Sequence, residues 1–208
     1  MASDIDICNL ALLRLGTRSS ISSLSENSTE AMTCALLFPV VRDGLLARHH
    51  WGFASRRTAL ADLGLPPDPW AFRYAYPTDC LQARSIHQPV AGAPLIPFAI
   101  SGDQDGAGNP IQVILTDQPQ AELVYTARIA SAALFDATFV EALSWTLAAE
   151  LGVALTGDRG MATYCMQAAG VAVAGAKAND SNETPDVVDR TPEWIGIRGA
   201  TMGGASVA

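Results

Sequence analysis

The stretch ARHHWGFASRR, residues 47–57, gathers side chains that could do chemistry: His49, His50, Trp51, Phe53, Arg56 and Arg57. Histidines bind metal ions or move protons, and arginines bind phosphate. Neighbouring residues on a helix point about 100° apart, so His49 and His50 cannot share a metal ion as an i, i+4 pair can. The only other histidine is His87, and we expect no metal site. We expect Trp51 and Phe53 to anchor the end of a helix in the core, with one histidine near the terminal carbonyls.

The arginine pair belongs to an acidic chain, whose net charge is −8. Nucleic-acid binders usually carry a basic surface, so this balance argues against a DNA-binding protein. We therefore expect Arg56 and Arg57 to form ion pairs within or between subunits. An acidic chain is still compatible with DNA that moves past it without being held.

Other candidate motifs are incomplete. The segment from Asp103 resembles the start of a calcium loop, with Asp105 at position 3 and Gly108 at position 6. Position 5 is Ala107 and position 12 is Ile114, so two ligands of an EF-hand are missing, and a hairpin loop is the expected structure. The sequence contains no GxSxG, GxxxxGK[ST] or GxGxxG pattern. We predict no catalytic residue and no cofactor.

Composition indicates a chain with a sizeable core and little surface charge. Apolar residues make up 49% and charged residues 16% of its 208 residues, against about 25% charged residues in typical soluble domains. Such a surface favours contact with copies of the same chain or with a partner. The cysteines Cys8, Cys34, Cys80 and Cys165 are scattered, and we expect them to be reduced and buried. We expect neither a secretory leader nor a membrane span, which needs about 20 apolar residues.

Helices are predicted at both ends of the chain. Ser3 and Asp6 form a capping-box pattern before a helix of residues 4–15, and Asn27 with Glu30 signals a second start. Apolar residues then follow a helical period as far as residue 51, with a kink or break expected at Pro39. A third helix starts at a cap on Asp136, and a fourth, rich in alanine and glycine, follows the sequence TGD at residues 156–158.

The middle of the chain predicts strands. The segments AFRYAY, CLQARSI, IQVILT and AELVYTA are extended in character, and SGDQDGAGNP is a turn by composition. The predicted class is α+β: a helical body made of the N- and C-terminal helices, a central β-rich insertion and an extended C-terminal tail. The corresponding boundaries are 1–51 and 128–179 for the body, 52–127 for the insertion and 180–208 for the tail. The tail carries one amphipathic cluster, Trp194, Ile195, Ile197 and Arg198.

Four segments in this order resemble the tail tubular protein A family, the head-to-tail adaptors of short-tailed phages. They are DICNLALLRLGT, EAMTCALLFPVVRDGLLARHHWGFASRR, WAFRYAYPTDCLQARSI and FVEALSWTLAAELG, and they cover roughly residues 4–157. The resemblance implies a virion protein made in the host cytoplasm that forms a ring, typically of twelve copies. The ring lies beneath the portal protein, extends the DNA channel toward the downstream tail nozzle protein, and has no enzymatic role.

The resemblance also implies that the C-terminal segment reaches the portal. On this chain that role falls to Trp194, Ile195, Ile197 and Arg198, although Trp194 folding back on its own subunit is the competing interpretation. DNA would pass through the lumen without specific binding, and no membrane is involved. Two other functions stay open. A tail-associated peptidoglycan hydrolase would need an exposed acid/base pair, and a DNA-binding accessory protein would need a basic surface.

Overall fold

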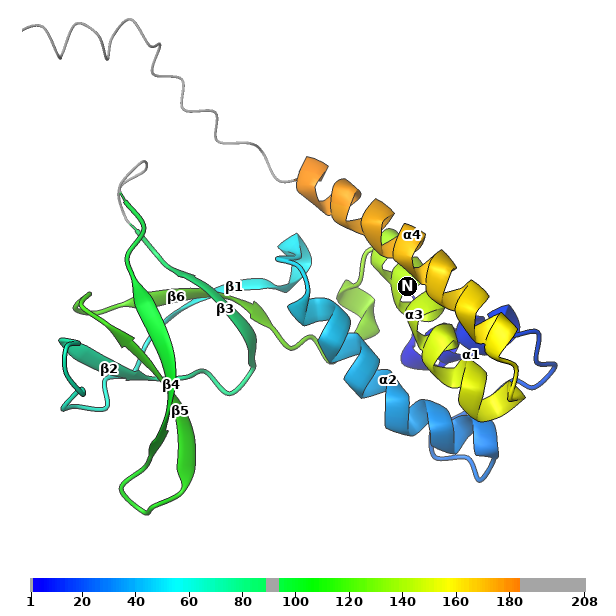
Figure 1. The fold of residues 1–208 in the computed structure, drawn as a ribbon, viewed down its shortest axis with the longest axis horizontal. Helices are drawn as coiled ribbons and strands as arrows, with labels where there is room; N and C mark the ends of the chain where they lie inside the picture. Colours follow the sequence, from blue (N-terminus) through cyan, green and yellow to red (C-terminus); the bar gives the residue numbers. More distant parts are fainter. Residues whose placement is uncertain (1, 89–93, 184–208) are drawn as a thin grey trace, which may run out of the picture.

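The computed structural model describes residues 2–88 and 94–183. Over these residues the protein is α+β, with helices gathered at one side of the molecule and strands at the other (Figure 1). In chain order two helices come first, six strands follow, and two helices close the described part. The residues of the amphipathic cluster, Trp194, Ile195, Ile197 and Arg198, lie outside the described residues.

Helix α1, Asp4–Arg14, begins as the sequence predicts. The Ser3 hydroxyl accepts the Asp6 backbone N–H, and the Asp6 carboxylate accepts the Ser3 N–H, which completes the capping box. Helix α2, Thr29–Ala47, begins one residue later than expected, because Ser28 and not Asn27 caps it by accepting the Ala31 N–H. The helix continues through Pro39 without interruption. The predicted break is therefore wrong, since one missing donor does not end a well-packed helix.

Helix α3, Ala137–Thr156, is the central helix and contacts the other three. Asp136 precedes it but makes no capping hydrogen bond, contrary to the sequence prediction. The predicted break after α3 is confirmed: Gly157 has φ +66°, and the Asp158 carboxylate caps the next helix by accepting the Gly160 N–H. Helix α4, Arg159–Glu183, runs past the predicted boundary at residue 179.

The strands form two antiparallel three-stranded sheets, ordered β1-β6-β3 and β2-β5-β4. Their bounds are β1 Ser55–Ala59, β2 Phe72–Ala75, β3 Cys80–Ile86, β4 Phe98–Gln104, β5 Pro110–Thr116 and β6 Glu122–Ala127. Residues 101–104 were predicted to lie in a turn, but they extend β4, and the turn is confined to residues 105–109. The pairing explains the error, because β4 forms a full ladder with β5 and needs little propensity of its own.

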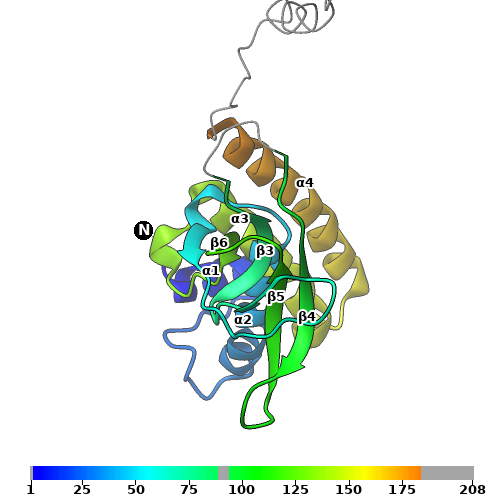
Figure 2. The same ribbon diagram turned by 90° about the vertical axis from the view of Figure 1, so that its left-hand side faces the viewer.

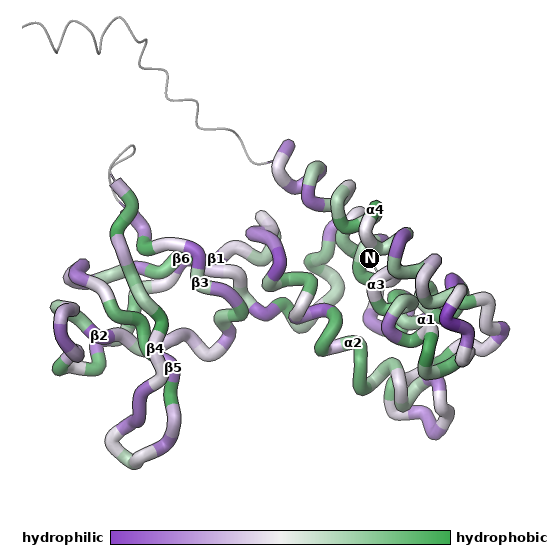
Figure 3. Tube along the Cα trace, viewed as in Figure 1, coloured by the Kyte–Doolittle hydropathy of each residue, from purple (hydrophilic) through white to green (hydrophobic). Residues whose placement is uncertain are grey.

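One hydrophobic core runs through the helices and into both sheets, where it includes Leu123 of β6 and Ile114 of β5. Figure 3 shows mostly hydrophobic residues along α2 and α3, and the largest fully buried side chains come from every helix but α4. Short 3-10 turns, η1 Gly52–Ala54 and η2 Ala132–Leu134, connect the helices to the strands. Figure 2 views the molecule from the strand side and shows α4 along one flank, with α2 lower in the molecule. The two helices thus pack on α3 from different sides.

Candidate functional site

Both histidines of the pair, His49 and His50, make contacts within the chain. The Nε2 atom of His49 lies 2.8 Å from the Asp180 carboxylate of α4, and the other oxygen of Asp180 accepts the Gly52 N–H at 2.7 Å. His50 Nε2 lies 2.9 Å from the Ser55 hydroxyl, and burial lowers the pKa of His50. The two rings therefore have separate partners. Across residues 2–88 and 94–183, no group of three His, Cys, Asp or Glu residues is placed to hold a metal ion.

The aromatic residues of the same stretch anchor the core, as the sequence predicts. Trp51 is buried and donates its indole N–H to the Leu45 carbonyl at 3.1 Å. Its ring packs edge-on against Phe139 of α3 with 4.9 Å between centroids, and Phe53 and Phe135 complete the cluster. Edge-to-face pairs of this kind add stability beyond area burial. The cluster fixes the junction between α2, β1 and α3.

Three arginines tie the strands together and to the helices. Arg56 pairs with Asp79 at 2.8 Å, and Arg57 pairs with Glu122 at 3.3 Å, so both make the intramolecular ion pairs that were expected. Arg84 of β3 donates to the Ala47 and His49 carbonyls at 2.9 and 2.6 Å. The rings of His49 and His50 bond to Asp180 and Ser55, so Arg84 takes the place at these carbonyls where a histidine was expected nearby. A guanidinium from a distant strand reaches them with two donors in a fixed geometry.

The aspartates of the supposed calcium loop serve the hairpin. Asp105 accepts the N–H groups of Ala107 and Asn109, both at 2.8 Å, and Gly108 has φ +84°. The side chain of Asn109 also donates to the Asp105 carboxylate, and this hydrogen bond, followed by those from the backbone, lowers the pKa of Asp105. Asp103 forms an ion pair with Arg73 at 2.7 Å. Asp105 thus holds the turn of the β4–β5 hairpin, and Asp103 ties β4 to Arg73 of β2.

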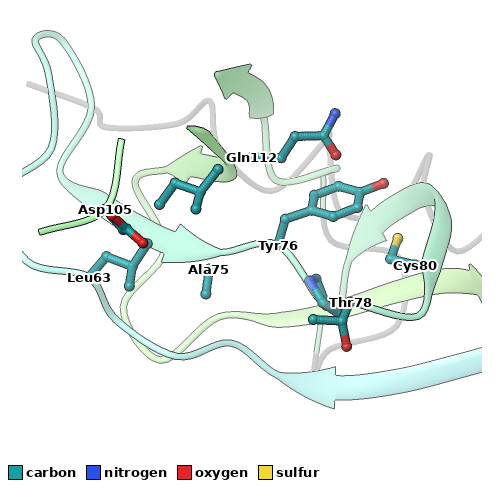
Figure 4. A pocket seen from close by; sticks show the side chains of 9 residues that line it. Leu63, Ala75, Tyr76, Thr78, Cys80, Asp105 and Gln112 are labelled. Carbon is teal, nitrogen blue, oxygen red and sulfur yellow. The ribbon is translucent and has the colours of Figure 1, made fainter. Parts of the chain in front are cut away.

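A hollow of about 470 Å³ lies where the link between β2 and β3 meets β5 (Figure 4). Tyr76 and Cys80 bring the most reactive groups to it, and Gln112 adds an amide. Burial raises the pKa of both the Cys80 thiol and the Tyr76 phenol. A thiol held in its neutral form is a poor nucleophile, because the thiolate is the attacking species. The hollow offers shape and mild polarity without an activated group.

Helix α2 presents an outward face that has no charge. Its exposed residues are all uncharged: Thr29, Met32, Ala35, Leu36, Val40 and Gly44. Met32, Leu36 and Val40 are 55%, 70% and 66% exposed and follow an i, i+4 spacing, so they form one ridge. Surface helices normally direct charged residues to solvent. We call this surface the α2 ridge, and it is a candidate interaction site that the sequence analysis did not identify.

Helix α4 has a second uncharged surface of different shape. Every exposed residue from Gly160 to Asn179 is uncharged, and most are small. Val171 is 76% exposed, and Met166 and Gly170 border a hollow of about 390 Å³ between α3 and α4. We call this surface the α4 face. Many of the small residues of α4 are exposed, among them Gly170, Ala174 and Gly175.

Helix α3 is the one described helix that is long and apolar enough to cross a membrane, although no such segment was expected. Its composition has another cause. It is the central helix, and Phe139, Leu143, Leu147 and Leu151 are fully buried against the other helices. A helix surrounded by packing partners is hydrophobic on most of its circumference.

Comparison with known proteins adds no assignment. A scan against protein-family models finds no model that matches the chain, and a search of curated proteins finds no match. The functional argument therefore depends on the residues themselves.

Proposed function

We propose that this chain is a structural head-to-tail adaptor of a short-tailed phage, which forms a ring of about twelve copies beneath the portal. The observation that carries the proposal is the pair of uncharged outward surfaces, the α2 ridge and the α4 face. A ring subunit must bury two different lateral surfaces against its neighbours. The resemblance of the four sequence segments to the adaptor family points to the same role.

The remaining features of the proposal follow the same architecture. The helices of residues 1–51 and 128–179 would form the body of the ring, and the β-rich insertion of residues 52–127 would project from it. The segment that follows α4, residues 184–208, would extend to the portal through Trp194, Ile195, Ile197 and Arg198. DNA would pass through a lumen that does not hold it, which suits the net charge of −8. The downstream partner would be the tail nozzle protein.

The charged side chains of the unusual stretch support a structural role. Arg56 and Arg57 are paired with carboxylates, and His49 contacts Asp180. Each of these groups maintains a contact within the chain. An enzyme would instead keep a polar group poised toward a cleft.

The test is to mix the purified protein with portal rings of the phage that carries its gene and to image the product by electron microscopy. We expect a second ring stacked coaxially beneath the portal. A double variant, Trp194→Ala with Ile197→Ala, should lower the occupancy of this ring, whereas Thr201→Ala in the same segment should not. A chain that never joins the portal would refute the proposal. Clearing of a cell-wall substrate by the same preparation would instead support the hydrolase alternative.

A further inference from the structure

We infer that the α2 ridge of one copy packs against the α4 face of the next copy, so that the ring closes through this single repeated contact. The inference rests on the proposed function for the ring itself. It adds which two surfaces meet, the α2 ridge of one copy and the α4 face of the next. Neither surface has a partner within the described part of the chain, although both belong to well-packed helices.

Shape favours a contact between the two different surfaces. The α2 ridge consists of the protruding side chains Met32, Leu36 and Val40, whereas the α4 face has a hollow at Gly170, between the exposed side chain of Met166 and helix α3. A β-carbon at Gly170 would meet no atom within 4 Å, so the backbone of α4 is open to approach there. Helices pack when the ridge of one enters the groove of the other. Two α2 ridges facing each other would bring bulky side chains against bulky side chains.

The distribution of charge permits a second copy as the occupant at these two surfaces. Two chains that each carry a net charge of −8 repel one another over most of their surface. The exposed residues of the α2 ridge and of the α4 face are uncharged, and the hollow beside Gly170 has one charged residue of each sign, Arg48 and Glu150, so contact there adds no excess of like charge. One chain carries both halves of the contact.

Position favours a ring. α2 and α4 pack on α3 from different sides, so the ridge and the face are presented by different flanks of the molecule (Figures 1 and 2). A contact between two different surfaces repeats from copy to copy and closes only as a ring or continues as a filament. An α2–α2 contact would stop at a dimer.

Size predicts a weak single contact. The 19 residues of α2 span about 28 Å at 1.5 Å per residue, and a helix is about 10 Å wide, which gives roughly 300 Å² per partner. Stable complexes bury about 800 Å² per partner. We therefore expect little dimer in dilute solution and assembly only where copies are concentrated or held around a template.

Cross-linking at high protein concentration tests the inference without a portal. We would prepare Leu36→Cys and Gly170→Cys chains and treat them with a short bismaleimide. The mixture of the two single variants should give a cross-linked dimer, and a double variant should give a ladder. Leu36→Cys alone should give no more dimer than the wild type, whose described cysteines are buried or half-buried.

Charge insertion gives the matched control. In the double-cysteine background, Val40→Glu should abolish the ladder, because it places a charge on the α2 ridge, whereas Leu13→Glu should leave the ladder intact. Leu13 is 69% exposed on α1, as exposed as the ridge residues but outside the ridge. Dimers from Leu36→Cys alone, or no cross-link in the mixture, would overturn the inference. A ladder with no ring on the portal would count against the proposed function only, and a portal ring unaffected by Val40→Glu would count against the inference only.

Discussion

A β-carbon added at Gly152 tests how closely α3 and α4 must approach. It would lie 3.1 Å from the Ala162 β-carbon, 3.2 Å from the Ala162 α-carbon and 3.4 Å from Leu15 Cδ2. The α-carbon belongs to the backbone of α4, so it cannot rotate away as a side chain would. At Gly175 of α4 the same addition would meet no atom within 4 Å. Gly175→Ala is therefore the matched control for Gly152→Ala.

The expected magnitudes follow from two opposing effects. Alanine in place of glycine stabilises a helix by about 1 kcal/mol. Overpacking of a tight contact costs about 1–3 kcal/mol. Gly175→Ala gains only the first effect and should raise the free energy of unfolding. Gly152→Ala should leave it unchanged or lower it by up to about 2 kcal/mol, so the difference between the variants reports the packing cost of about 1–3 kcal/mol.

Urea unfolding followed by tryptophan fluorescence and circular dichroism measures this difference. With a slope of about 2 kcal/mol per M urea, the two midpoints should differ by about 0.5–1.5 M. Equal slopes for both variants would show that the native structure is otherwise preserved. If Gly152→Ala raises the midpoint as much as Gly175→Ala, α3 and α4 do not approach as closely as the structure shows. The placement of the α4 face would then need revision.

Two further substitutions test the packing and the electrostatics of α3. Burial and the neighbouring carboxylates Glu183 and Asp180 raise the pKa of Asp136, so its charged form destabilises the folded state above the folded pKa. Asp136→Asn should raise the melting temperature at pH 7. It should lose this advantage as the pH falls well below 3.8, where the wild-type carboxyl is neutral in both states. An advantage that persists at low pH would refute the electrostatic cause. Phe139→Ala should lower the free energy of unfolding by about 3–5 kcal/mol, because Phe139 is fully buried in the aromatic cluster. Val153→Ala, on the exposed side of α3, should change the free energy of unfolding by less than about 0.5 kcal/mol. Comparable losses for both variants in urea unfolding would contradict the assigned core.

The local features of the fold could be predicted from the sequence. The capping box of Ser3 and Asp6, the cap at Asp158 and the strand segments around Tyr74 and Val124 depend on residues close in the chain. Features set by distant partners could not. Residues 101–104 become a strand because β5 pairs with them, and the carbonyls after α2 are taken by Arg84 of β3.

The α2 ridge could not be predicted from the sequence for a related reason. α2 is apolar on nearly all sides, so Met32 and Leu36 have the same character as the buried Cys34 and Phe38. Sequence period alone cannot identify the side that faces α3, because both sides satisfy it. His49 and Asp180 lie 131 residues apart in the chain, so no local sequence pattern predicts their contact. The outward position of the ridge became visible only with the packing of α2 on α3.

The composition of α4 is the strongest physical reason to look for a partner there. Gly160, Gly170 and Gly175 weaken the helix by about 1 kcal/mol each relative to alanine, and its exposed middle has no ion pairs to compensate. The helix is held by its packing along α3, by the cap from Asp158 at its start and by the contacts of Asp180 with Gly52 and His49 near its end. Glutamate and lysine on the outward side would have stabilised an exposed helix and improved solubility. A small, uncharged surface costs stability in a free chain, and contact with the ridge of a neighbouring copy would offset that cost.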